Sequence, residues 1–325
     1  MPKNLAVVIL NWNGKNWLEK FLPSVVSFSQ DADIYVIDNL STDDSVEFIQ
    51  AHFPAVKIVK NNHNYGFAGG YNEGLKEIKN EYYCLLNSDV EVTENWSIPA
   101  LDLFEKDPSI SAVQPKILSF NNKKQFEFAG AAGGLIDNLG YPYCRGRIFD
   151  ELEEDNGQYN DETEIFWASG CCFFVRSKDF WEQNGFDERF FAHQEEIDLC
   201  WRLINSGKKI FYTGKSKVYH VGGGTLNKQS ARKTYLNIRN NLSMMLKNLP
   251  FPKLIGLLFF RLCLDGIAGI YFGLKNGFPH LWAVVRAHFG FYGQLPGTWK
   301  LRQKHQMNKF YQSKWLIFRH FLGGK

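Results

Sequence analysis

Hydrophobic residues in the first hundred positions form short continuous runs that are separated by longer stretches of mixed polarity. The runs are rich in β-branched and aromatic side chains, as in strands buried on both faces. They lie at residues 5–10, 33–38, 56–60 and 82–86. The stretches between them predict helices from about residue 15, from residues 41–44 and over residues 71–79. Strand, helix and strand at this spacing predict an α/β fold with an open, mostly parallel sheet flanked by helices, because parallel neighbours need long crossovers.

The pattern changes after residue 107. Residues 107–164 combine short strand-like runs, glycines and an acidic, turn-rich stretch, which predicts a variable and partly mobile loop region. Regular structure resumes at residues 165–176, where the sequence IFWASGCCFFVR predicts a pair of strands followed by a helix. The regular part of the sheet is therefore predicted from the first hundred residues.

Polar residues follow the carboxyl end of each predicted strand. Ligands of open α/β sheets bind at this edge, where loops and helix N-termini meet. Asn, Asp and Gly also make ordinary turns, which explains any one of these loops without a ligand. Four successive polar strand ends together favour a binding site. They are Asn11 with Asn13, Asp38 with Asn39, residues 61–70, and Asn87 with Ser88 and Asp89.

The net charge of +3 conceals two segments of opposite sign. Residues 250–325 contain eleven Lys or Arg against the single acid Asp265, which gives +10, whereas residues 1–249 carry −7. This asymmetry points to a basic tail that contacts an anionic surface, either lipid or nucleic acid. We therefore predict one large domain over residues 1–249 and a basic, aromatic-rich, amphipathic helical tail over residues 250–325.

The tail has the composition of a helix at a membrane surface. Residues 254–274 are long enough to span a bilayer, but Arg261 and Asp265 lie near the centre, where each charge costs about 2.5–3.5 kcal/mol. Their i, i+4 spacing allows them to pair. We expect a helix lying in the interface of an anionic membrane, because the later basic residues alternate with large apolar ones. The same alternation disfavours nucleic acid. A helical cap or dimer contact packed on the large domain is the alternative.

The cysteine content and the N-terminus favour a cytoplasmic protein. The six cysteines show no CxxC pair and no zinc-like spacing, so reduced thiols are expected. The apolar run at residues 5–10 is shorter than the core of a signal peptide. Together with the tail, these features predict a cytoplasmic protein that is peripheral on the inner face of the cell membrane.

Six segments in residues 5–245 make the chain resemble glycosyltransferase family 2, of the GT-A fold, and its rhamnosyltransferase-like branch. They are VVILNWNG, VIDNLSTDDS, NYGFAGGYNEG, LLNSDV, GFDERFFAHQEEIDLCWRL and VYHVGGGT. The resemblance implies a nucleotide-binding sheet and an inverting enzyme that moves a sugar, with rhamnose expected, from a nucleotide-diphosphate donor. The implied acceptor is a saccharide or a polyprenyl-linked one in cell-surface polysaccharide synthesis. The chain lacks the QxxRW sequence of processive synthases, so single-sugar addition is expected.

The resemblance assigns donor contacts to the strand ends. The acid in the place of Asp38 holds the nucleobase under the loop of Asn11 and Asn13, and a carboxylate can accept from a pyrimidine N–H. An Asx turn or helix cap is the alternative for Asp38. Residues 64–70 lead into a helix N-terminus, which suits the phosphates or ribose of a nucleotide. The remaining expected donor contacts are Asn39, Asn64, Gly66, Phe67, Gly69, Asn87, Ser88 and Arg239.

The resemblance also assigns a divalent cation, Mg²⁺ or Mn²⁺, to Asp89 and His220. Residues 87–89 stand in the place of the family's DxD sequence, with Asn87 replacing the first acid. Carboxylate oxygens and imidazole nitrogens are suitable ligands for these metals. A lone histidine such as His220 is more commonly a packing residue, and this is the alternative. The glycines at residues 222–224 are expected to form the hinge of a loop that closes over the donor.

Three acids at the start of a predicted helix are the catalytic candidates. Glu195 and Asp198 share a helical face, while Glu196 points about a hundred degrees away. By resemblance Glu196 is the general base, with Glu195 the second candidate, and Asp198 is expected to pair with Arg202. The alternative is a solvated acidic face at a helix N-terminus.

Two other functional classes remain open at this point. A nucleotidyltransferase shares an open sheet and an acidic metal site, but it normally has a lysine-bearing, glycine-rich loop after the first strand, where this chain has NWNGKNW. A non-catalytic nucleotide-sugar-binding protein is expected if Asn87 abolishes metal binding.

Overall fold

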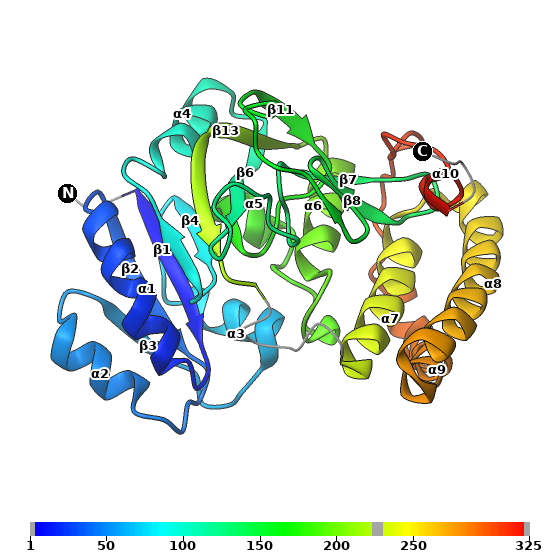
Figure 1. Cartoon of the computed structure of the whole chain (residues 1–325), viewed down its shortest axis with the longest axis horizontal. Coiled ribbons are helices and arrows are strands. Elements are labelled where there is room, and N and C mark those ends of the chain that lie inside the picture. The colour runs from blue at the N-terminus through cyan, green and yellow to red at the C-terminus, as the bar shows by residue number, and fades with distance from the viewer. Residues whose placement is uncertain (1–3, 223–229, 322–325) are drawn as a thin grey trace.

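A large mixed β-sheet forms the centre of the computed structural model, which describes residues 4–222 and 230–321 (Figure 1). Within these residues the sheet has nine strands, and β5 (Val90–Val92) pairs with one of them off the main path. The path runs β11 (Glu162–Ile165), β13 (Lys209–His220), β6 (Ile110–Ser119), β12 (Cys172–Arg176), β4 (Tyr82–Leu86), β1 (Leu5–Asn11), β2 (Ala32–Asp38) and β3 (Lys57–Lys60).

The first hundred residues form the parallel sheet that their sequence predicts. Strands β4, β1, β2 and β3 are parallel neighbours, and α1 (Lys15–Phe28) and α2 (Ser45–His52) connect β1 to β2 and β2 to β3. The register places Asn11 directly beside Asp38 at the carboxyl ends of β1 and β2. The predicted strand-end cluster therefore lies at one edge of the sheet.

The third predicted helix is displaced toward the N-terminus. Helix α3 spans Gly66–Leu75, whereas residues 71–79 were expected to be helical. The glycines suggested a loop, but they are required by packing, since a Cβ atom at Gly74 would lie 2.5 Å from Ile37 Cδ1 of β2. Small residues thus let α3 lie close against the sheet, and this tertiary contact outweighs the low helix propensity of glycine.

The prediction of a loop region at residues 107–164 is wrong for its first part. Strand β6 lies inside the sheet between β12 and β13, and its polar residues are buried with partners. Gln114 donates to the carbonyl of Gly130 at 2.9 Å, and Lys116 Nζ lies 2.8 Å from Asp155 Oδ2. These tertiary partners allow a polar sequence to occupy a central strand.

A second, four-stranded sheet follows β6 in the chain. It contains β7 (Gly134–Ile136), β8 (Pro142–Cys144), β9 (Arg147–Ile148) and β10 (Glu151–Leu152). The expected strand pair in residues 165–176 is also corrected, because β11 pairs with β13 while β12 lies antiparallel between β4 and β6. The loop between β11 and β12 therefore crosses the sheet, and it becomes part of the candidate site.

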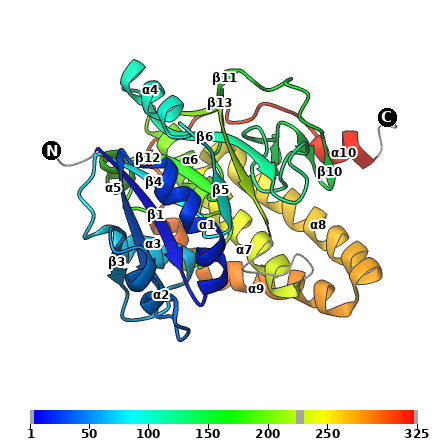
Figure 2. The same ribbon diagram turned by 60° about the vertical axis from the view of Figure 1, so that its left-hand side comes forward.

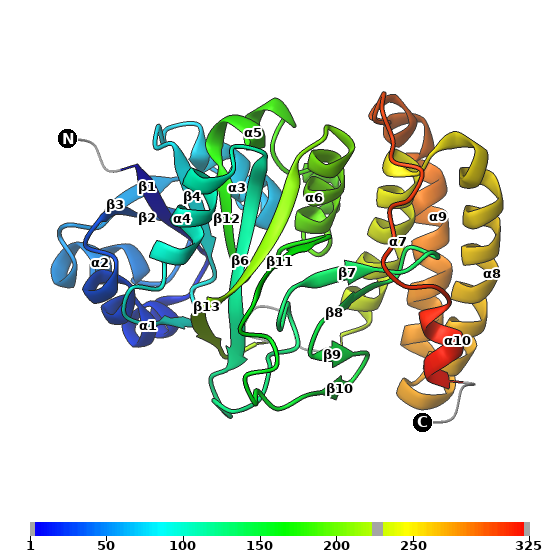
Figure 3. The ribbon, with the colours of Figure 1, turned by 90° about the horizontal axis from the view of Figure 1, so that it is seen from above.

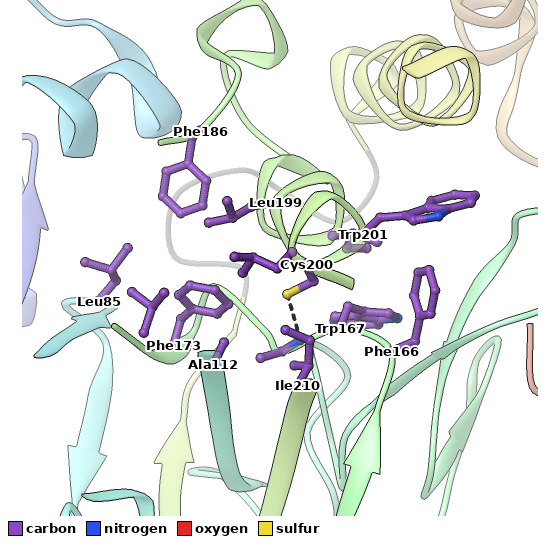
Figure 4. Packing of buried hydrophobic residues seen from close by; sticks show 14 of the residues in the cluster. Leu85, Ala112, Phe166, Trp167, Phe173, Phe186, Leu199, Cys200, Trp201 and Ile210 are labelled. Atoms are coloured by element: carbon purple, nitrogen blue, oxygen red, sulfur yellow. Dashed lines mark hydrogen bonds between the residues drawn. The ribbon is translucent and has the colours of Figure 1, made fainter. Parts of the chain in front are cut away.

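Helices cover both faces of the main sheet. Helix α1 and α4 (Ile98–Lys106) bury apolar residues against one face, and α1 crosses the front of the sheet in Figure 2. Helices α3, α5 (Ser177–Glu182) and α6 (Glu195–Asn205) pack on the other face. Figure 4 shows Leu199 and Cys200 of α6 over Phe173 and Ile210 of the sheet, with the Ala168 N–H donating to Cys200 Sγ at 3.5 Å. This packing fixes α6 relative to the sheet.

The C-terminal helices form a separate layer beside the smaller sheet (Figure 3). It consists of α7 (Ala231–Asn248), α8 (Phe251–Asn276) and α9 (Phe278–Lys300), with the short α10 (Leu316–Phe321) at its edge. Helix α7 contacts both α8 and α9 and also packs against α6. The layer therefore touches the sheet domain through α7 and through the loop that joins β7 to β8.

Helix α8 buries two charged side chains against the protein and exposes large apolar ones. The predicted pair of Arg261 and Asp265 is confirmed, with Nη2 and Oδ1 3.5 Å apart, and both side chains face the protein. Arg261 also donates to the carbonyl of Leu139 at 2.7 Å and lies 3.6 Å above the ring of Tyr141. In the part of the chain that is described, α8 is the one helix long and apolar enough to cross a membrane.

Candidate active site

The ends of β1 and β2 are joined by hydrogen bonds between the predicted nucleobase residues. Asn11 Nδ2 donates to Asp38 Oδ1 at 3.2 Å and to Ser41 Oγ at 3.0 Å. Asp38 Oδ2 accepts from the backbone N–H of Ser41, three residues further on, so Asp38 also stabilises the loop that follows its own strand. Asn13 Oδ1 accepts from the N–H of Thr42 at 2.7 Å. The loop after β1 is therefore fixed on the loop after β2.

A second group of amides links β2 to the loop before α3. Asn39 Nδ2 donates to Asn64 Oδ1 and to the Gly66 carbonyl, each at 3.0 Å, and Asn39 Oδ1 accepts from Asn61 Nδ2 at 3.0 Å. Asn64 Oδ1 also accepts from the N–H of Gly66. The strand-end residues Asn39 and Asn64 thus shape the donor loop, and they lie next to the Asn11 and Asp38 pair.

The N-terminus of α3 is occupied by a neighbouring loop. The N–H groups of Phe67 and Ala68 donate to the carbonyl of Phe191, at 2.8 and 3.3 Å. Gly66 has φ +72, and a Cβ there would lie 2.6 Å from the Phe191 ring, so glycine is needed for this approach. The sequence suggested that this helix N-terminus would bind the phosphates or ribose of a nucleotide. The structure instead uses Gly66 and Phe67 to join α3 to residues 188–194, and Gly69 packs beside Tyr65.

Asp89 and His220 lie together where β4 leads into β5 and where β13 ends. His220 Nε2 is 3.1 Å from Asp89 Oδ1, and both side chains are buried. Asn87 Nδ2 lies 3.5 Å from the same ring nitrogen. Ser88 lies between Asn87 and Asp89 in the chain, and its Oγ is near the loop after β1. The strands β5 and β13 pair here, with His220 opposite Val90, which explains how positions 131 residues apart meet.

Glu127 is a neighbour of His220 that sequence reasoning did not identify. Its Oε2 lies 3.2 Å from His220 Nδ1, so the imidazole is held between two carboxyl groups. Burial disfavours a charge on His220, but Cys171, Asp89 and Glu127 outweigh burial and raise its pKa. The signal for Glu127 was absent because it lies in the stretch predicted as loop. Of the expected glycine hinge, residues 223 and 224 lie outside the described residues.

No group of three or more His, Cys, Asp and Glu side chains has the arrangement of a metal site within residues 4–222 and 230–321. Asp89 and His220 are nevertheless an oxygen and a nitrogen donor at one position. Such a pair suits a hard divalent cation that takes its other ligands from a bound diphosphate.

Glu195 and Glu196 start α6 on the other side of the loop that joins β11 to β12. Burial raises the pKa of Glu195 well above its ordinary value, and the adjacent Glu196 raises it further. Burial also raises the pKa of Glu196, although backbone N–H groups, including that of Gly170, oppose the effect. One carboxyl oxygen of each acid is buried without a hydrogen-bond partner in the described structure. These are the properties of carboxylates held for proton transfer.

The predicted metal and base residues border the same loop, residues 168–171. A Cβ at Gly170 would lie 3.8 Å from the carboxyl carbon of Glu196 and 3.4 Å from the ring of Phe67. The next residue, Cys171, accepts from the Asn87 N–H at 3.0 Å through its carbonyl. Gly170 and Cys171 thus separate Glu196 on one side from residues 87–89 on the other. The base candidate and residues 87–89 therefore contact adjacent residues of one loop.

Asp198 lies in a buried ion cluster and does not face this loop. Arg202 Nε donates to Asp198 Oδ2 at 2.8 Å, which confirms the expected pair, and Lys247 Nζ is 2.7 Å from the same oxygen. Asn248 Nδ2 donates to the other carboxyl oxygen at 3.0 Å. A carboxylate with all these partners stabilises the contact of α6 with α7. It is not suited to accept a proton from a substrate.

Arg239 is likewise committed to the protein. Its Nη2 donates to the carbonyls of Arg189 and Phe190, at 2.9 and 3.1 Å, and to Asn240 Oδ1 at 2.7 Å. The side chain is buried. The resemblance gave Arg239 to the donor diphosphate, but its donors point at backbone carbonyls of the loop before α6. Its role in this structure is to hold that loop.

The model of glycosyl transferase family 2 matches residues 6–183, which is more than half of the chain. The chain belongs to this family. Membership of this family favours sugar transfer over the alternative of nucleotidyl transfer. It confirms the resemblance that the sequence motifs indicated. The matched segment of this family 2 enzyme includes Asn11, Asp38 and Asp89 and ends before Glu196 and His220.

Relatives of this family 2 enzyme with assigned names are also glycosyltransferases. The N-acetylglucosaminyl-diphospho-decaprenol L-rhamnosyltransferase of Mycobacterium tuberculosis is 24% identical over 237 residues, which cover 68% of this chain and 76% of the relative. The rhamnosyltransferase WbbL of Escherichia coli is 39% identical over 62 residues, 19% of this chain and 23% of the relative.

Solved structures confirm that this glycosyltransferase has the GT-A type of fold. A structure of GalNAc-T7 with UDP, GalNAc and Mn²⁺ has a TM-score of 0.61 at 18% identity, over 78% of this chain and 49% of that one. TarS residues 1–349 from S. aureus give 0.58 at 13% identity, over 93% and 83%. A mannosyltransferase of Pyrobaculum calidifontis, in complex with GDP-Man and Mn²⁺, gives 0.53 at 13% identity, over 91% and 76%.

Proposed function

We propose that this enzyme is an inverting glycosyltransferase that adds one sugar, with rhamnose the leading candidate, to a lipid-linked saccharide. The contacts of Glu196 with Gly170 and of residues 87–89 with Cys171 carry the proposal, because sugar transfer needs charge neutralisation and proton removal at neighbouring positions. The mycobacterial relative is named for rhamnosyl transfer to N-acetylglucosaminyl-diphospho-decaprenol, which supports the sugar and the acceptor class.

The nucleotide-diphosphate donor would bind along the strand ends. Asp38 and Asn11 would face the nucleobase, and Asn39 and Asn64 would shape the loop beside the ribose. Asn11 Oδ1 supports this assignment, because it is buried and has no hydrogen-bond partner among the described residues. Burying such an acceptor is unfavourable unless a ligand donates to it. Ser88 precedes Asp89, and its Oγ lies near Gly14 of the loop after β1.

The residues just before β5 and at the end of β13 fit a divalent cation, Mg²⁺ or Mn²⁺. Asp89 Oδ1 and His220 Nε2 are already 3.1 Å apart, and Glu127 at the far ring nitrogen would orient the imidazole. When bound, the cation would neutralise charge on the leaving diphosphate. Asn87 contributes no charge, so the protein supplies one carboxylate and the diphosphate supplies the remaining oxygens.

Glu196 would act as the general base. Its carboxylate takes the proton from the acceptor hydroxyl while that oxygen bonds to the anomeric carbon. The bond from this carbon to the diphosphate breaks with its electron pair, and a single displacement inverts the anomeric configuration. The acceptor hydroxyl would approach the Glu196 carboxyl group beside Gly170, where the lack of a side chain keeps the Phe67 ring and the carboxyl group close to the backbone.

Transfer assays on three variants test this function. Asp89→Ala should lose metal-dependent turnover, whereas Glu196→Gln should keep donor binding and lose about 10² to 10⁴ in kcat. Glu182→Gln changes an exposed carboxylate on α5 and is the matched control, with wild-type rates expected. Donors are screened by mass spectrometry with and without Mn²⁺. Absence of metal-dependent turnover with every nucleotide-sugar would refute the proposed metal-dependent transfer. Full activity of Glu196→Gln would refute the assignment of Glu196 as the general base.

We propose further that the helical layer holds the enzyme on an anionic membrane surface, on the cytoplasmic side. One face of α8 exposes an apolar stripe at i, i+3 and i+4 spacing, while its charged pair faces inward. The stripe consists of Phe251, Ile255, Phe259, Cys263, Ile267, Ile270 and Leu274. A helix with this inverted polarity suits a bilayer interface better than water. Exposed Lys253 and Lys275 at its two ends complement anionic lipid.

Cys263 provides a direct measurement, because it is exposed and the other five cysteines are buried. An environment-sensitive fluorophore on Cys263 should shift to the blue with anionic vesicles, less so with zwitterionic vesicles or at high salt. Ile255→Glu should weaken the shift, and Ile98→Glu on α4 is the control at another exposed apolar side chain. A stable dimer that buries the label without vesicles would assign the stripe to a second copy of the chain and refute the membrane role.

A further inference from the structure

The loop that leads into Glu196 has an unusual backbone. Phe191 has φ 64, His193 has φ 71 and Gln194 has φ 70, so three residues out of four have a positive φ without being glycine. Each such residue is energetically unfavourable and persists only where surrounding contacts determine it. Gln194 is the residue that precedes α6, so the loop sets the direction in which the helix begins.

Every carbonyl of residues 189–193 accepts a hydrogen bond from outside the loop. Phe191 accepts from the N-terminus of α3, and the other four accept from two side chains of α7. Asn240 Nδ2 donates to the carbonyls of Phe190, Ala192 and His193, at 3.1, 3.0 and 2.7 Å. The strained conformation is thus held mainly by one amide group together with its neighbour Arg239.

Asn240 is itself held rigidly. Its side chain is fully buried, and its Oδ1 accepts from Arg239 Nε at 2.9 Å and Nη2 at 2.7 Å. The two side chains form a fixed pair whose donors converge on the loop. Since α7 is also tied to α6 through the Asp198 cluster, its position relative to the sheet domain is set at two separate points.

We propose that Asn240 is a positioning residue that holds the strained loop so that the Glu196 carboxyl group stays beside Gly170. The proposal rests on the proposed role of Glu196 as general base. Asn240 makes none of its bonds with Glu196 and acts through the backbone of residues 190–194. Without the amide the loop would relax toward ordinary backbone conformations, and the first turn of α6 would rotate with it.

The kinetic test begins with Asn240→Ala. Displacing a catalytic group by about 1 Å lowers the rate by about 10²-fold, so kcat should fall by about that factor while donor affinity stays at its wild-type value. Asn205→Ala is the matched control, because this buried amide also bonds to a carbonyl, that of Asn248, at the opposite end of α6. It should lose stability and keep kcat. Asn240→Ser, which retains one donor, is the milder variant if Asn240→Ala does not fold.

A double-mutant cycle separates positioning from general destabilisation. If Asn240 acts through Glu196, Asn240→Ala should lower kcat no further when combined with Glu196→Gln. Additive losses, or a wild-type kcat in both Asn240 variants, would overturn the positioning role while leaving the base assignment intact. Full activity of Glu196→Gln alone would remove the base and overturn both assignments, so the two failures are distinguishable.

Discussion

The Lys247→Met substitution would remove an ammonium group that bonds to two buried carboxylates. Lys247 Nζ lies 2.7 Å from Asp198 Oδ2 and 2.9 Å from Asp187 Oδ2, and its side chain is 2% exposed. Removing one partner of a buried ion pair costs about 3–5 kcal/mol, because the remaining charge stays desolvated. Arg202 still bonds to Asp198, so we expect the lower end, about 3 kcal/mol.

This loss should appear as a fall of about 6 °C in Tm, at roughly 2 °C per kcal/mol for a chain of this size. Burial alone would raise the pKa of Asp187, but Arg189 and Lys247 outweigh it and lower the pKa. The stability that Asp187 contributes is therefore present above its unfolded pKa and is lost as the pH falls. Without Lys247 the folded pKa rises, so the variant should begin to lose stability at a higher pH.

Thermal and denaturant unfolding of Lys247→Met measure both effects. Lys209→Met is the matched control. Lys209 Nζ lies 2.9 Å from Asp107 Oδ2, the same distance as in the Lys247 and Asp187 pair, but the two side chains are 43% and 34% exposed. An exposed pair contributes at most about 1 kcal/mol. Equal losses in the two variants would show that burial of the Lys247 cluster adds nothing, and the reasoning would fail.

Three further outcomes are expected. Glu127→Gln should weaken Mn²⁺ affinity by about 10- to 100-fold in calorimetric titration, because His220 loses the carboxylate that orients its ring. An unchanged affinity would contradict this role of Glu127. The kcat of transfer should rise with pH through a pKa above the ordinary glutamate value, since Glu196 must lose its proton in a buried site, and a pH-independent kcat would speak against it. Glu195→Gln should raise Tm more at pH 8 than near pH 4.5. The raised pKa of Glu195 means that the protonated acid stabilises the fold at low pH and that this stability is lost as the pH rises through the folded pKa, whereas glutamine stays neutral at both pH values. Equal Tm changes at the two pH values would count against burial of this charge.

Three strands and one ion pair show where local sequence was sufficient. Strands β1, β2 and β4 follow from continuous apolar runs bounded by polar residues, and their carboxyl ends carry Asn11, Asp38 and Asp89 as predicted. Periodicity also gave the Asp198 and Arg202 pair, because residues four apart on a helix are neighbours. These features depend on residues close in the chain, so the sequence contains the whole signal.

Strand β6 and helix α3 show where local sequence was not sufficient. The polar residues of β6 are buried because distant groups such as Asp155 satisfy them, and the glycines of α3 are helical because β2 lies close to them. The role of Arg239 depended on the position of residues 189–190, about fifty positions away. No pattern within one segment predicts such partners.

Local sequence was enough to predict the parallel half of the sheet, the polar strand ends and the two acids at the start of α6, because each of these features depends on residues that are neighbours in the chain. Tertiary structure alone decided that His220 lies between Asp89 and Glu127, that Asn240 holds the loop before Glu196, and that α8 turns its ions inward and its apolar stripe outward. The physical reason is that hydrogen bonds and burial between distant segments arise only when the strands and helices pack together.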